Sequence, residues 1–164
     1  MKEFLSGIGL AKFSVLSESM GAIYALATAA ACERAAKNLF LLSPFVTLKE
    51  LLPLFANGAW LEQIYGFLRN ASIDESVMAT KNMYANASPT MLRLVEPQMD
   101  GIGFDSWMQA RPLGFEIDKI EQNSIVWHSK EYKEAPFEAA MQISKMLPYC
   151  ELIGSDDTCG GQKA

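Results

Sequence analysis

The sequence predicts an α/β fold: a short parallel sheet of about four strands, flanked by helices and interrupted by an all-helical insertion. A strand followed by a helix is expected twice, in residues 13–31 and in residues 124–147. Between them, residues 47–109 contain helical patterns and no strand pattern. Strands that alternate with helices on either side of a strandless span indicate one α/β core with a helical insertion.

Residues 1–46 are expected to form the first part of the α/β core. Lys2 to Gly9 has the apolar spacing of the end of a helix, and Phe13 to Leu16 is a short strand. Met20 to Lys37 is rich in alanine and other strong helix formers, which predicts a helix. Asn38 to Leu42 is an apolar run without polar alternation, as expected for a parallel strand covered on both faces.

Residues 47–111 are expected to form a helical, cap-like insertion. Apolar side chains recur at helical spacing from Leu48 to Leu68, and Pro89 and Pro97 separate the later helical pieces. The large apolar side chains of this span have two interpretations, as the walls of a pocket or as the insertion's own core. They are Trp60, Tyr65, Phe67, Met91 and Trp107.

Residues 112–154 are expected to return to the α/β core. Ser124 to His128 is typical of a strand, Ala135 to Leu147 of a helix with a proline near its first turn, and Cys150 to Ile153 of a last short strand. Residues 155–164 are polar, which predicts a disordered tail.

Composition limits the partners of this chain. The formal net charge is −5 and the basic residues form no cluster, which argues against nucleic acid because phosphate binding needs clustered positive charge. The longest apolar run, Ala22 to Cys32, is shorter than the ~20 residues that span a bilayer, and the start lacks the pattern of a signal peptide. Three scattered cysteines, Cys32, Cys150 and Cys159, indicate reduced thiols instead of a disulfide framework or a zinc site. We therefore expect a cytoplasmic protein without metal, cofactor or membrane partner.

A serine at the apex of a strand, turn and helix is the main candidate for chemistry. Ser19 lies between the first strand and the alanine-rich helix, with the small residues Ser17 and Gly21 on either side. This pattern suits a nucleophile elbow, a sharp turn that exposes the hydroxyl and lets the next backbone N–H, here of Met20, face a developing oxyanion. Alternatively, Ser19 is an ordinary helix N-cap whose hydroxyl accepts a hydrogen bond from the first turn.

Four stretches occur in a particular order along the chain: FSVLSESMGAIYALATAAA (13–31), NLFLLSPF (38–45), PLGFEIDKI (112–120) and VWHS through Pro136 (126–136). They resemble the nucleophile elbow, the next strand, the return from the cap, and the acid-bearing strand and loop of the α/β-hydrolase family. The resemblance covers nearly the whole chain but only the C-terminal half of that fold. It implies a partial α/β-hydrolase fold with a helical cap and an ester-type ancestry with Ser19 at the nucleophile position. Ser17 stands where the family favours glycine.

The sequence departs from the family at the catalytic acid and base. The family's acid would fall on Tyr132, which is not a carboxylate, while Glu131 and Glu134 lie nearby at other backbone positions. The family's histidine would follow the last strand, and residues 156–159 contain none. His128 is the only histidine, and the resemblance places it before the acid loop, where we expect a packed residue at the end of a strand. An improvised relay in which Glu131 orients His128 is the alternative.

The resemblance also implies a free sheet edge. In the family about half of the sheet precedes the elbow, whereas here only Met1 to Lys12 precede the first strand. That strand would become an edge, and an exposed apolar edge invites strand addition. We expect self-association or a partner chain at this edge, or a longer protein of which this chain is a fragment.

Two hypotheses of function follow. The first is an α/β-hydrolase-family protein of ester-type ancestry that acts through Ser19 on a small apolar substrate, truncated and catalytically impaired in this form. The second is a non-catalytic module, which holds a ligand or a partner in the residual cap pocket or at the open sheet edge.

Overall fold

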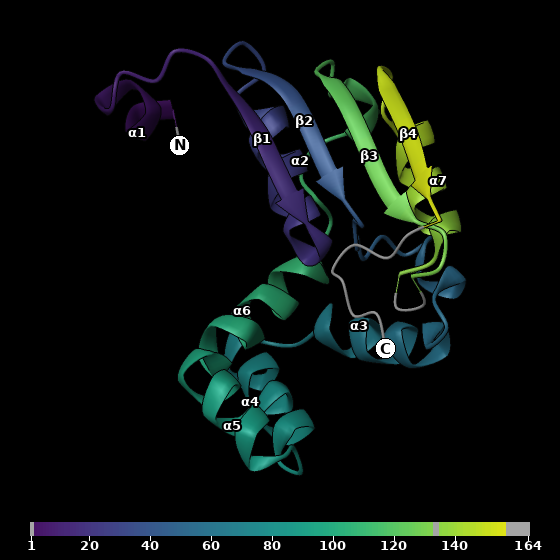
Figure 1. Cartoon of the computed structure of the whole chain (residues 1–164). Helices are drawn as coiled ribbons and strands as arrows, with labels where there is room; N and C mark the ends of the chain where they lie inside the picture. Colours follow the sequence, from purple (N-terminus) through teal and green to yellow (C-terminus); the bar gives the residue numbers. More distant parts are fainter. Residues whose placement is uncertain (1, 133–134, 157–164) are drawn as a thin grey trace. The chain divides into compact units, whose positions relative to one another are not determined.

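A computed structural model describes residues 2–132 and 135–156 of the chain. The chain divides into two compact units (Figure 1). The sheet unit consists of Met1–Gly58 and Leu113–Ala164, and the helical unit consists of Ala59–Pro112. The sequence pattern suggested divisions after residues 46 and 111.

Within the described residues, the sheet unit contains four parallel strands, as predicted. In spatial order they are β1 (Phe13–Glu18), β2 (Ala36–Leu42), β3 (Asn123–Ser129) and β4 (Cys150–Ser155). The order in space follows the order in sequence, so β1 and β4 are the two edges of the sheet (Figure 1). All carboxyl ends lie on one side, where parallel sheets commonly carry their functional residues.

Two helices cover one face of the sheet. Helix α2 (Ala22–Ala31) connects β1 to β2 and packs on both, and α7 (Phe137–Met146) does the same for β3 and β4. Because right-handed crossovers that step in the same direction place their helices on the same side, both lie on one face (Figure 1). We call this the helix-covered face. Its buried side chains include Leu26, Leu39, Leu41, Val126 and Ile143.

Helix α2 is shorter than the sequence predicts. The alanine-rich pattern suggested a helix from Met20 to Lys37, whereas α2 ends at Ala31 and β2 begins at Ala36. Ala36 is buried and pairs with Phe13 of β1. Helix propensity differs by less than about 1 kcal/mol per residue, so burial and pairing in the sheet determine where the helix ends.

The remaining elements of the sheet unit are short. Helix α1 (Lys2–Gly7) precedes β1, and 3-10 turns cover Ser19–Gly21, Leu52–Leu54 and Ile117–Lys119. Pro136 is the N-cap of α7, one position before the first turn where the sequence suggested it. Residues 157–164 of the expected disordered tail lie outside the described residues.

The second face of the sheet, which we call the open face, carries neither α2 nor α7 (Figure 1). Side chains alternate between the two faces of a strand, and the strand register aligns those of the open face in rows. A polar row of Ser14, Asn38 and Asn123 lies toward the amino ends, and two rows extend over all four strands. One row is Leu16, Phe40, Ile125 and Glu151, and the other is Glu18, Leu42, Trp127 and Ile153. None of these eight side chains is buried. Phe40 and Leu42 are half-buried, so the expectation that the apolar run of β2 is covered on both faces is met only in part.

The helical unit, all of whose residues are described, contains no strand. Its elements are α3 (Gly58–Leu68), α4 (Ile73–Tyr84), α5 (Pro89–Val95), a 3-10 turn (Glu96–Gln98) and α6 (Met99–Gln109). Helix α4 begins with a capping box, in which the Ser72 hydroxyl accepts from the Glu75 N–H and the Glu75 carboxylate accepts from the Ser72 N–H. These hydrogen bonds lower the pKa of Glu75.

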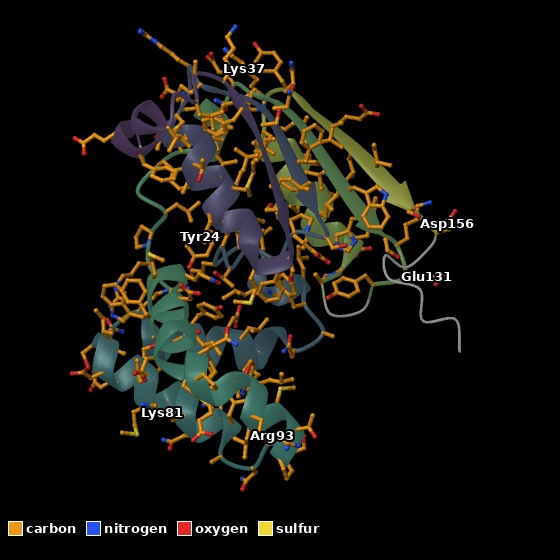
Figure 2. The ribbon with its side chains drawn as sticks, turned by 60° about the vertical axis from the view of Figure 1, so that its left-hand side comes forward. Tyr24, Lys37, Lys81, Arg93, Glu131 and Asp156 are labelled. Atoms are coloured by element: carbon orange, nitrogen blue, oxygen red, sulfur yellow. The ribbon has the colours of Figure 1, made fainter. Side chains whose placement is uncertain are left out.

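Close contact between α4 and α6 holds the helical unit together. A Cβ atom added to Gly103 would lie 2.6 Å from the Cα atom of Val77, so the backbones can approach only because position 103 is glycine. The buried hydroxyl of Ser76 donates a 2.7 Å hydrogen bond to the Gly103 carbonyl. Lys81 and Arg93 lie on the surface of this unit (Figure 2), and Lys81 pairs with Asp100 at 2.9 Å.

Trp107 and Arg111 bind the end of α6 to the segment that connects α3 and α4 through hydrogen bonds. The Arg111 guanidinium lies 3.5 Å from the centroid of the Trp107 ring and donates hydrogen bonds to the carbonyls of Leu68 and Ala71. The Trp107 indole N–H also donates to the Ala71 carbonyl, at 2.9 Å. Trp107 therefore has a structural role inside the unit, as the second interpretation of the aromatic set suggested.

Candidate functional site

The candidate site is the turn that follows β1. Ser19 comes directly after the last residue of β1 and opens the 3-10 turn that leads into α2. Its φ angle is +51°, in the left-handed region that residues other than glycine rarely adopt. Such backbone costs about 1–3 kcal/mol and is concentrated at functional sites. A strained serine between a parallel strand and a helix has the geometry of a nucleophile elbow.

The structure contradicts the N-cap interpretation of Ser19. The N-cap residue of α2 is Gly21, and α2 has no side-chain capping hydrogen bond. Ser19 takes part in the turn through its backbone, because its carbonyl accepts the N–H groups of Ala22 and of Phe45, the latter at 3.0 Å. An N-cap role therefore does not explain why a serine stands at this strained position.

The turn after β2 braces the elbow, and sequence reasoning did not identify it as part of the site. Ser43 also has a positive φ, +42°, and its N–H donates a 2.8 Å hydrogen bond to the Trp127 carbonyl of β3. Two residues later, the N–H of Phe45 reaches the Ser19 carbonyl. The neighbouring strands β1 and β2 are thus both followed directly by a serine with left-handed backbone. The Ser43-Pro44 pair gave no signal of this backbone, because proline ordinarily pushes the residue before it into an extended conformation.

The residues on either side of the elbow are small and lie close together. A Cβ atom added to Gly21 would lie 3.5 Å from the Cβ atom of Ser17, which is an ordinary van der Waals contact. The Ser17 hydroxyl is buried and has no hydrogen-bond partner among the described residues. A buried hydroxyl without a partner destabilises the fold, so the serine at this position, where the family favours glycine, carries a penalty.

Met20 occupies the second position of the turn, directly before Gly21 and the first residue of α2. Its backbone N–H belongs to the amino end of a helical segment, where the unpaired N–H groups create a partial positive charge. A negative oxygen that develops beside Ser19 would be stabilised there. The side chain of Met20 is exposed and takes no part in this role.

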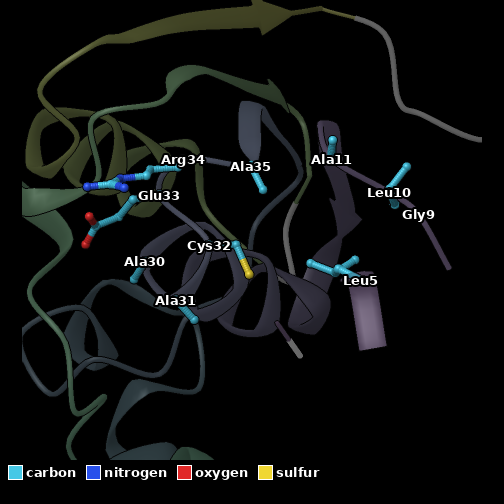
Figure 3. Close-up of a pocket in the computed structure, with 10 residues that line it drawn as sticks. All are labelled: Leu5, Gly9, Leu10, Ala11, Ala30, Ala31, Cys32, Glu33, Arg34 and Ala35. Atoms are coloured by element: carbon cyan, nitrogen blue, oxygen red, sulfur yellow. The ribbon is translucent and has the colours of Figure 1, made fainter. Parts of the chain in front are cut away.

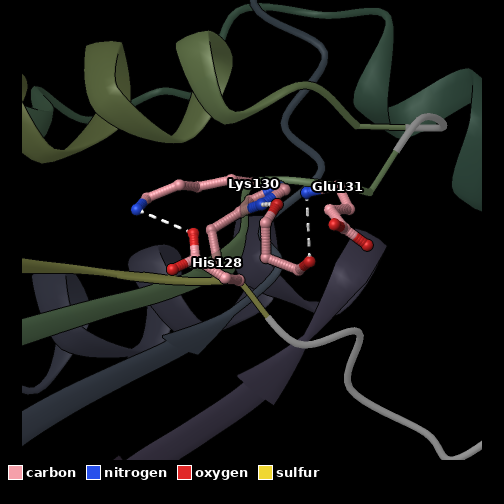
Figure 4. Close-up of polar contacts among 5 residues, drawn as sticks. His128, Lys130 and Glu131 are labelled. Carbon is pink, nitrogen blue, oxygen red and sulfur yellow. Dashed lines mark hydrogen bonds and ion pairs between the residues drawn. The ribbon is translucent and has the colours of Figure 1, made fainter.

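The position of the expected catalytic acid lies after β3. Tyr132 donates a long backbone hydrogen bond, 3.4 Å, to the Ser129 carbonyl, and its ring centroid is 5.9 Å from that of His128. The Glu131 N–H donates to the Ser129 hydroxyl, while its exposed carboxylate extends away from His128 (Figure 4). Glu134 lies outside the described residues. Among the described residues of this loop, no carboxylate is in the position of a catalytic acid toward His128.

His128 is a packed residue on the helix-covered face. Its side chain is 0% exposed, its Nδ1 atom lies 2.6 Å from the Ser129 carbonyl, and its ring meets that of Phe137 edge-on. The carbonyl accepts, so Nδ1 carries the proton and Nε2 has no partner among the described residues. Burial lowers the pKa of His128, although the carbonyls of Ser129 and Ala135 and the charge of Glu138 act in the other direction.

The strand register separates His128 from Ser19. Glu18 pairs with Leu42 and Leu42 pairs with Trp127, so the backbones of Ser19 and His128 lie about two strand spacings, or roughly 10 Å, apart. A relay needs the imidazole within hydrogen-bond distance of the hydroxyl. The His128 ring instead packs against α7, so the improvised relay of His128 and Glu131 does not form in this structure.

The larger described cavities of the sheet unit do not include the elbow. A cavity of about 840 Å³ lies at the amino end of β1, lined by residues 5, 9–11 and 30–35 (Figure 3). A second, of about 450 Å³, also lies at the amino ends of the strands, near Lys37 (Figure 2). The side chains of the carboxyl ends, such as Glu131 and Asp156, lie at the other end of the sheet (Figure 2).

The described part of the chain contains no group of three or more His, Cys, Asp or Glu side chains that could hold a metal ion. None of its helices is both long enough and apolar enough to cross a bilayer.

Comparisons with known proteins identify the fold. No family description and no curated protein matches the sequence. Among solved structures, an α/β-fold family hydrolase from Bacillus anthracis matches with a TM-score of 0.59 and 13% identity, over 93% of this chain and 62% of that one. A hydrolase from Pseudomonas aeruginosa matches with 0.57 and 16%, over 94% and 60%. A thermophilic esterase from Thermogutta terrifontis matches with 0.55 and 14%, over 93% and 59%.

The chain thus spans about three-fifths of the length of the solved structures that it matches. All three are described as hydrolases or esterases. The parallel sheet of four strands and the helical span between β2 and β3 match the expectation from the sequence. This protein has a partial α/β-hydrolase fold.

Proposed function

We propose that Ser19 occupies the nucleophile position of an ester-type hydrolase whose catalysis is impaired in this chain. The observation that carries the proposal is the +51° φ angle of Ser19 at the turn between β1 and α2. A simple connection does not need a strained serine, whereas an elbow needs it to present the hydroxyl. The fold shared with a thermophilic esterase supports an ester as the substrate class. The substrate that we propose is also apolar.

The proposed chemistry is attack of the Ser19 hydroxyl on an ester carbonyl. The bond to the serine oxygen forms as the carbonyl oxygen becomes negative, and the Met20 N–H is placed to stabilise that charge. The hydroxyl must lose its proton to a base, and a serine without a base is a weak nucleophile at neutral pH. His128 is buried about two strands away, and Tyr132 stands at the acid position. Solvent water is then the acceptor of the serine proton and the donor to the alkoxide that leaves as the ester C–O bond breaks. Slow acylation with release of the alcohol, and without efficient turnover, is the expected result.

A fluorophosphonate probe tests this proposal. We expect slow labelling of the native chain that disappears in Ser19→Ala, and no ester turnover above that of Ser19→Ala. Ser14→Ala is the matched control, because Ser14 is an exposed serine on the same strand. His128→Gln should keep the labelling, since His128 is not the base in this arrangement.

Each other outcome has a definite meaning. Labelling that persists in Ser19→Ala would place the reactive group elsewhere. Ester turnover well above that of Ser19→Ala would show that the chain is not impaired. Complete absence of labelling would refute a reactive Ser19 and leave the binding function as the better proposal.

A specific observation favours that second function, a non-catalytic binding module. Within the described residues β1 pairs only with β2, so its other edge has free backbone groups. An exposed strand edge can receive another strand through main-chain hydrogen bonds.

We also propose a cytoplasmic location. The free thiols of Cys32 and Cys150 support it, because thiols stay reduced in that compartment.

A further inference from the structure

The polar cavity at the amino ends of the strands has no part in the proposed function. It has a volume of about 450 Å³ and is lined by residues 33, 36–37, 119 and 121–123, all of the sheet unit. Lys37 marks this end of the sheet in Figure 2. Because Ser19 follows the carboxyl end of β1, this cavity is separate from the elbow.

Gln122, directly before β3, is the buried polar residue of this cavity. Its side chain is 5% exposed, and its Nε2 atom donates hydrogen bonds of 3.3 Å to the carbonyls of Ala29 and Glu33 around the carboxyl end of α2. These two bonds fix the orientation of the amide. Its Oε1 atom then has no hydrogen-bond partner among the described residues. A buried acceptor without a partner costs free energy, so a donor that reaches Gln122 Oε1 is favoured.

The surroundings of Gln122 favour a donor with a positive charge. The carboxyl end of a helix carries a partial negative charge, and the last turn of α2 has no basic residue to offset it. The cavity is also lined by Glu33 and Glu121, and neither carboxylate forms an ion pair within the described part of the chain. An ammonium group supplies both the N–H donors and the charge that match this side of the cavity.

A negatively charged group fits next to that ammonium. Asn38 pairs with Asn123 in the sheet, so Lys37 and Gln122, each one position earlier, lie side by side with their backbones about 5 Å apart. Lys37 is exposed and forms no ion pair among the residues that the structure describes. Of the described residues that line the cavity only Ala36 is apolar, which favours a small polar ligand.

We propose that this cavity binds a small zwitterion of the α-amino acid class. The ammonium group of the ligand donates to Gln122 Oε1 and faces Glu33 and Glu121. Its carboxylate faces Lys37. One carbon atom joins the two charged groups of an α-amino acid, which suits the single strand spacing between Gln122 and Lys37. The charged side chains around Gln122 are exposed and change rotamer readily, so a ligand of this size has access to Oε1.

Titration of the isotope-labelled chain with glycine, followed by heteronuclear NMR, tests the proposal. We expect a dissociation constant in the millimolar range, because exposed ion pairs contribute little free energy. The resonances that shift should include the backbone N–H groups of Glu33 and Lys37 and the side-chain amide of Gln122. Acetate, which lacks the ammonium group, and methylamine, which lacks the carboxylate, are the matched control ligands. Each should bind about threefold more weakly or less.

Variants of the lining residues assign the contacts. Lys37→Gln and Glu121→Gln each remove one charge and should raise the dissociation constant of glycine about two- to fivefold. Gln122→Met removes the buried acceptor and should raise it at least about tenfold. Lys12→Gln and Glu151→Gln are the matched controls, because both residues are exposed charges of the sheet unit outside the cavity lining, and they should leave binding unchanged. Far-UV circular dichroism reports whether each variant folds.

Absence of shifts at a glycine concentration of about 50 mM would overturn the proposal and leave the cavity to water. Acetate or methylamine that binds as tightly as glycine would exclude a zwitterion site. An equal loss in Lys12→Gln would assign the effect to the overall charge of the chain. If Gln122→Met does not fold, Lys37→Gln and Glu121→Gln still decide, because both residues are exposed. Ser19→Ala should bind glycine as the native chain does, so the outcome does not depend on the proposed hydrolase function.

Discussion

Mild acid should destabilise the sheet unit through a single residue, His128. The imidazole is fully buried, donates through Nδ1 to the Ser129 carbonyl and leaves Nε2 without a partner among the described residues. Burial therefore lowers its pKa in the folded state, and the neutral form is the stable one. Because His128 is the only histidine, no other side chain of ordinary pKa titrates in the same range.

The sign and size follow from proton linkage. Below an unfolded pKa of about 6.5, the unfolded chain takes up a proton that the folded chain does not. The stabilisation of the folded chain by a neutral His128 is therefore present above this pH and is lost as the pH falls below it. If His128 stays neutral when folded, the free energy of unfolding falls by about 1.4 kcal/mol between about pH 7.5 and about pH 5.5. Most carboxylates titrate below this range.

Two measurements check this prediction. The imidazole proton resonance of the single histidine reports its pKa directly in the folded chain, and urea unfolding at a series of pH values reports the free energy. His128→Gln should remove the slope between pH values of about 7.5 and 5.5 while the rest of the acid transition remains. A folded His128 that titrates at or above about 6.5, or a His128→Gln variant with the same slope as the native chain, would refute the reasoning.

Three further predictions concern the elbow and the helical unit. Ser17→Ala removes a buried hydroxyl without a partner and should raise the free energy of unfolding by about 1 kcal/mol in urea titrations; no gain, or a loss, would mean that the hydroxyl is satisfied in solution. In urea titrations, the free energy of unfolding of Ser19→Gly should be about 1 kcal/mol higher than that of Ser19→Ala, because only glycine adopts a positive φ without strain. Equal stability of the two variants would contradict a strained backbone at Ser19. Gly103→Ala should destabilise the helical unit by about 1–3 kcal/mol in thermal denaturation, since its Cβ would collide with Val77. Gly101→Ala, in the same helix with nothing within 4 Å, is the matched control and should be neutral or stabilising; a similar loss in both variants would argue against the collision.

The order of elements could be predicted because their signals are local. An apolar run, a proline after a strand and an alanine-rich segment each restrict the backbone within a few residues. The same locality explains the error at α2, which the sequence extended to Lys37. Helix propensity is a property of single residues, so it does not include the pairing of the buried Ala36 with Phe13 in the sheet.

The candidate site was predictable only in part. Serine with small neighbours indicated a sharp turn at Ser19, which the structure contains. The family resemblance put Tyr132 at the position of the acid, and that stays a prediction. The brace from Phe45, and the strained backbone of Ser43, depend on two strands lying side by side. A sequence pattern does not show which strands lie next to each other in the sheet.

The sequence alone determined the kind of elements, their succession along the chain, their parallel arrangement and the small-residue turn around Ser19, because these follow from local sterics and from apolar periodicity. Only the tertiary structure decided which side of the sheet each strand residue faces and whether that side is covered. It put His128 under α7 and away from Ser19, and it left the open face with Trp127 at its centre. The physical reason is that burial depends on which elements pack together, and an apolar run is compatible with a sheet covered on one face or on both.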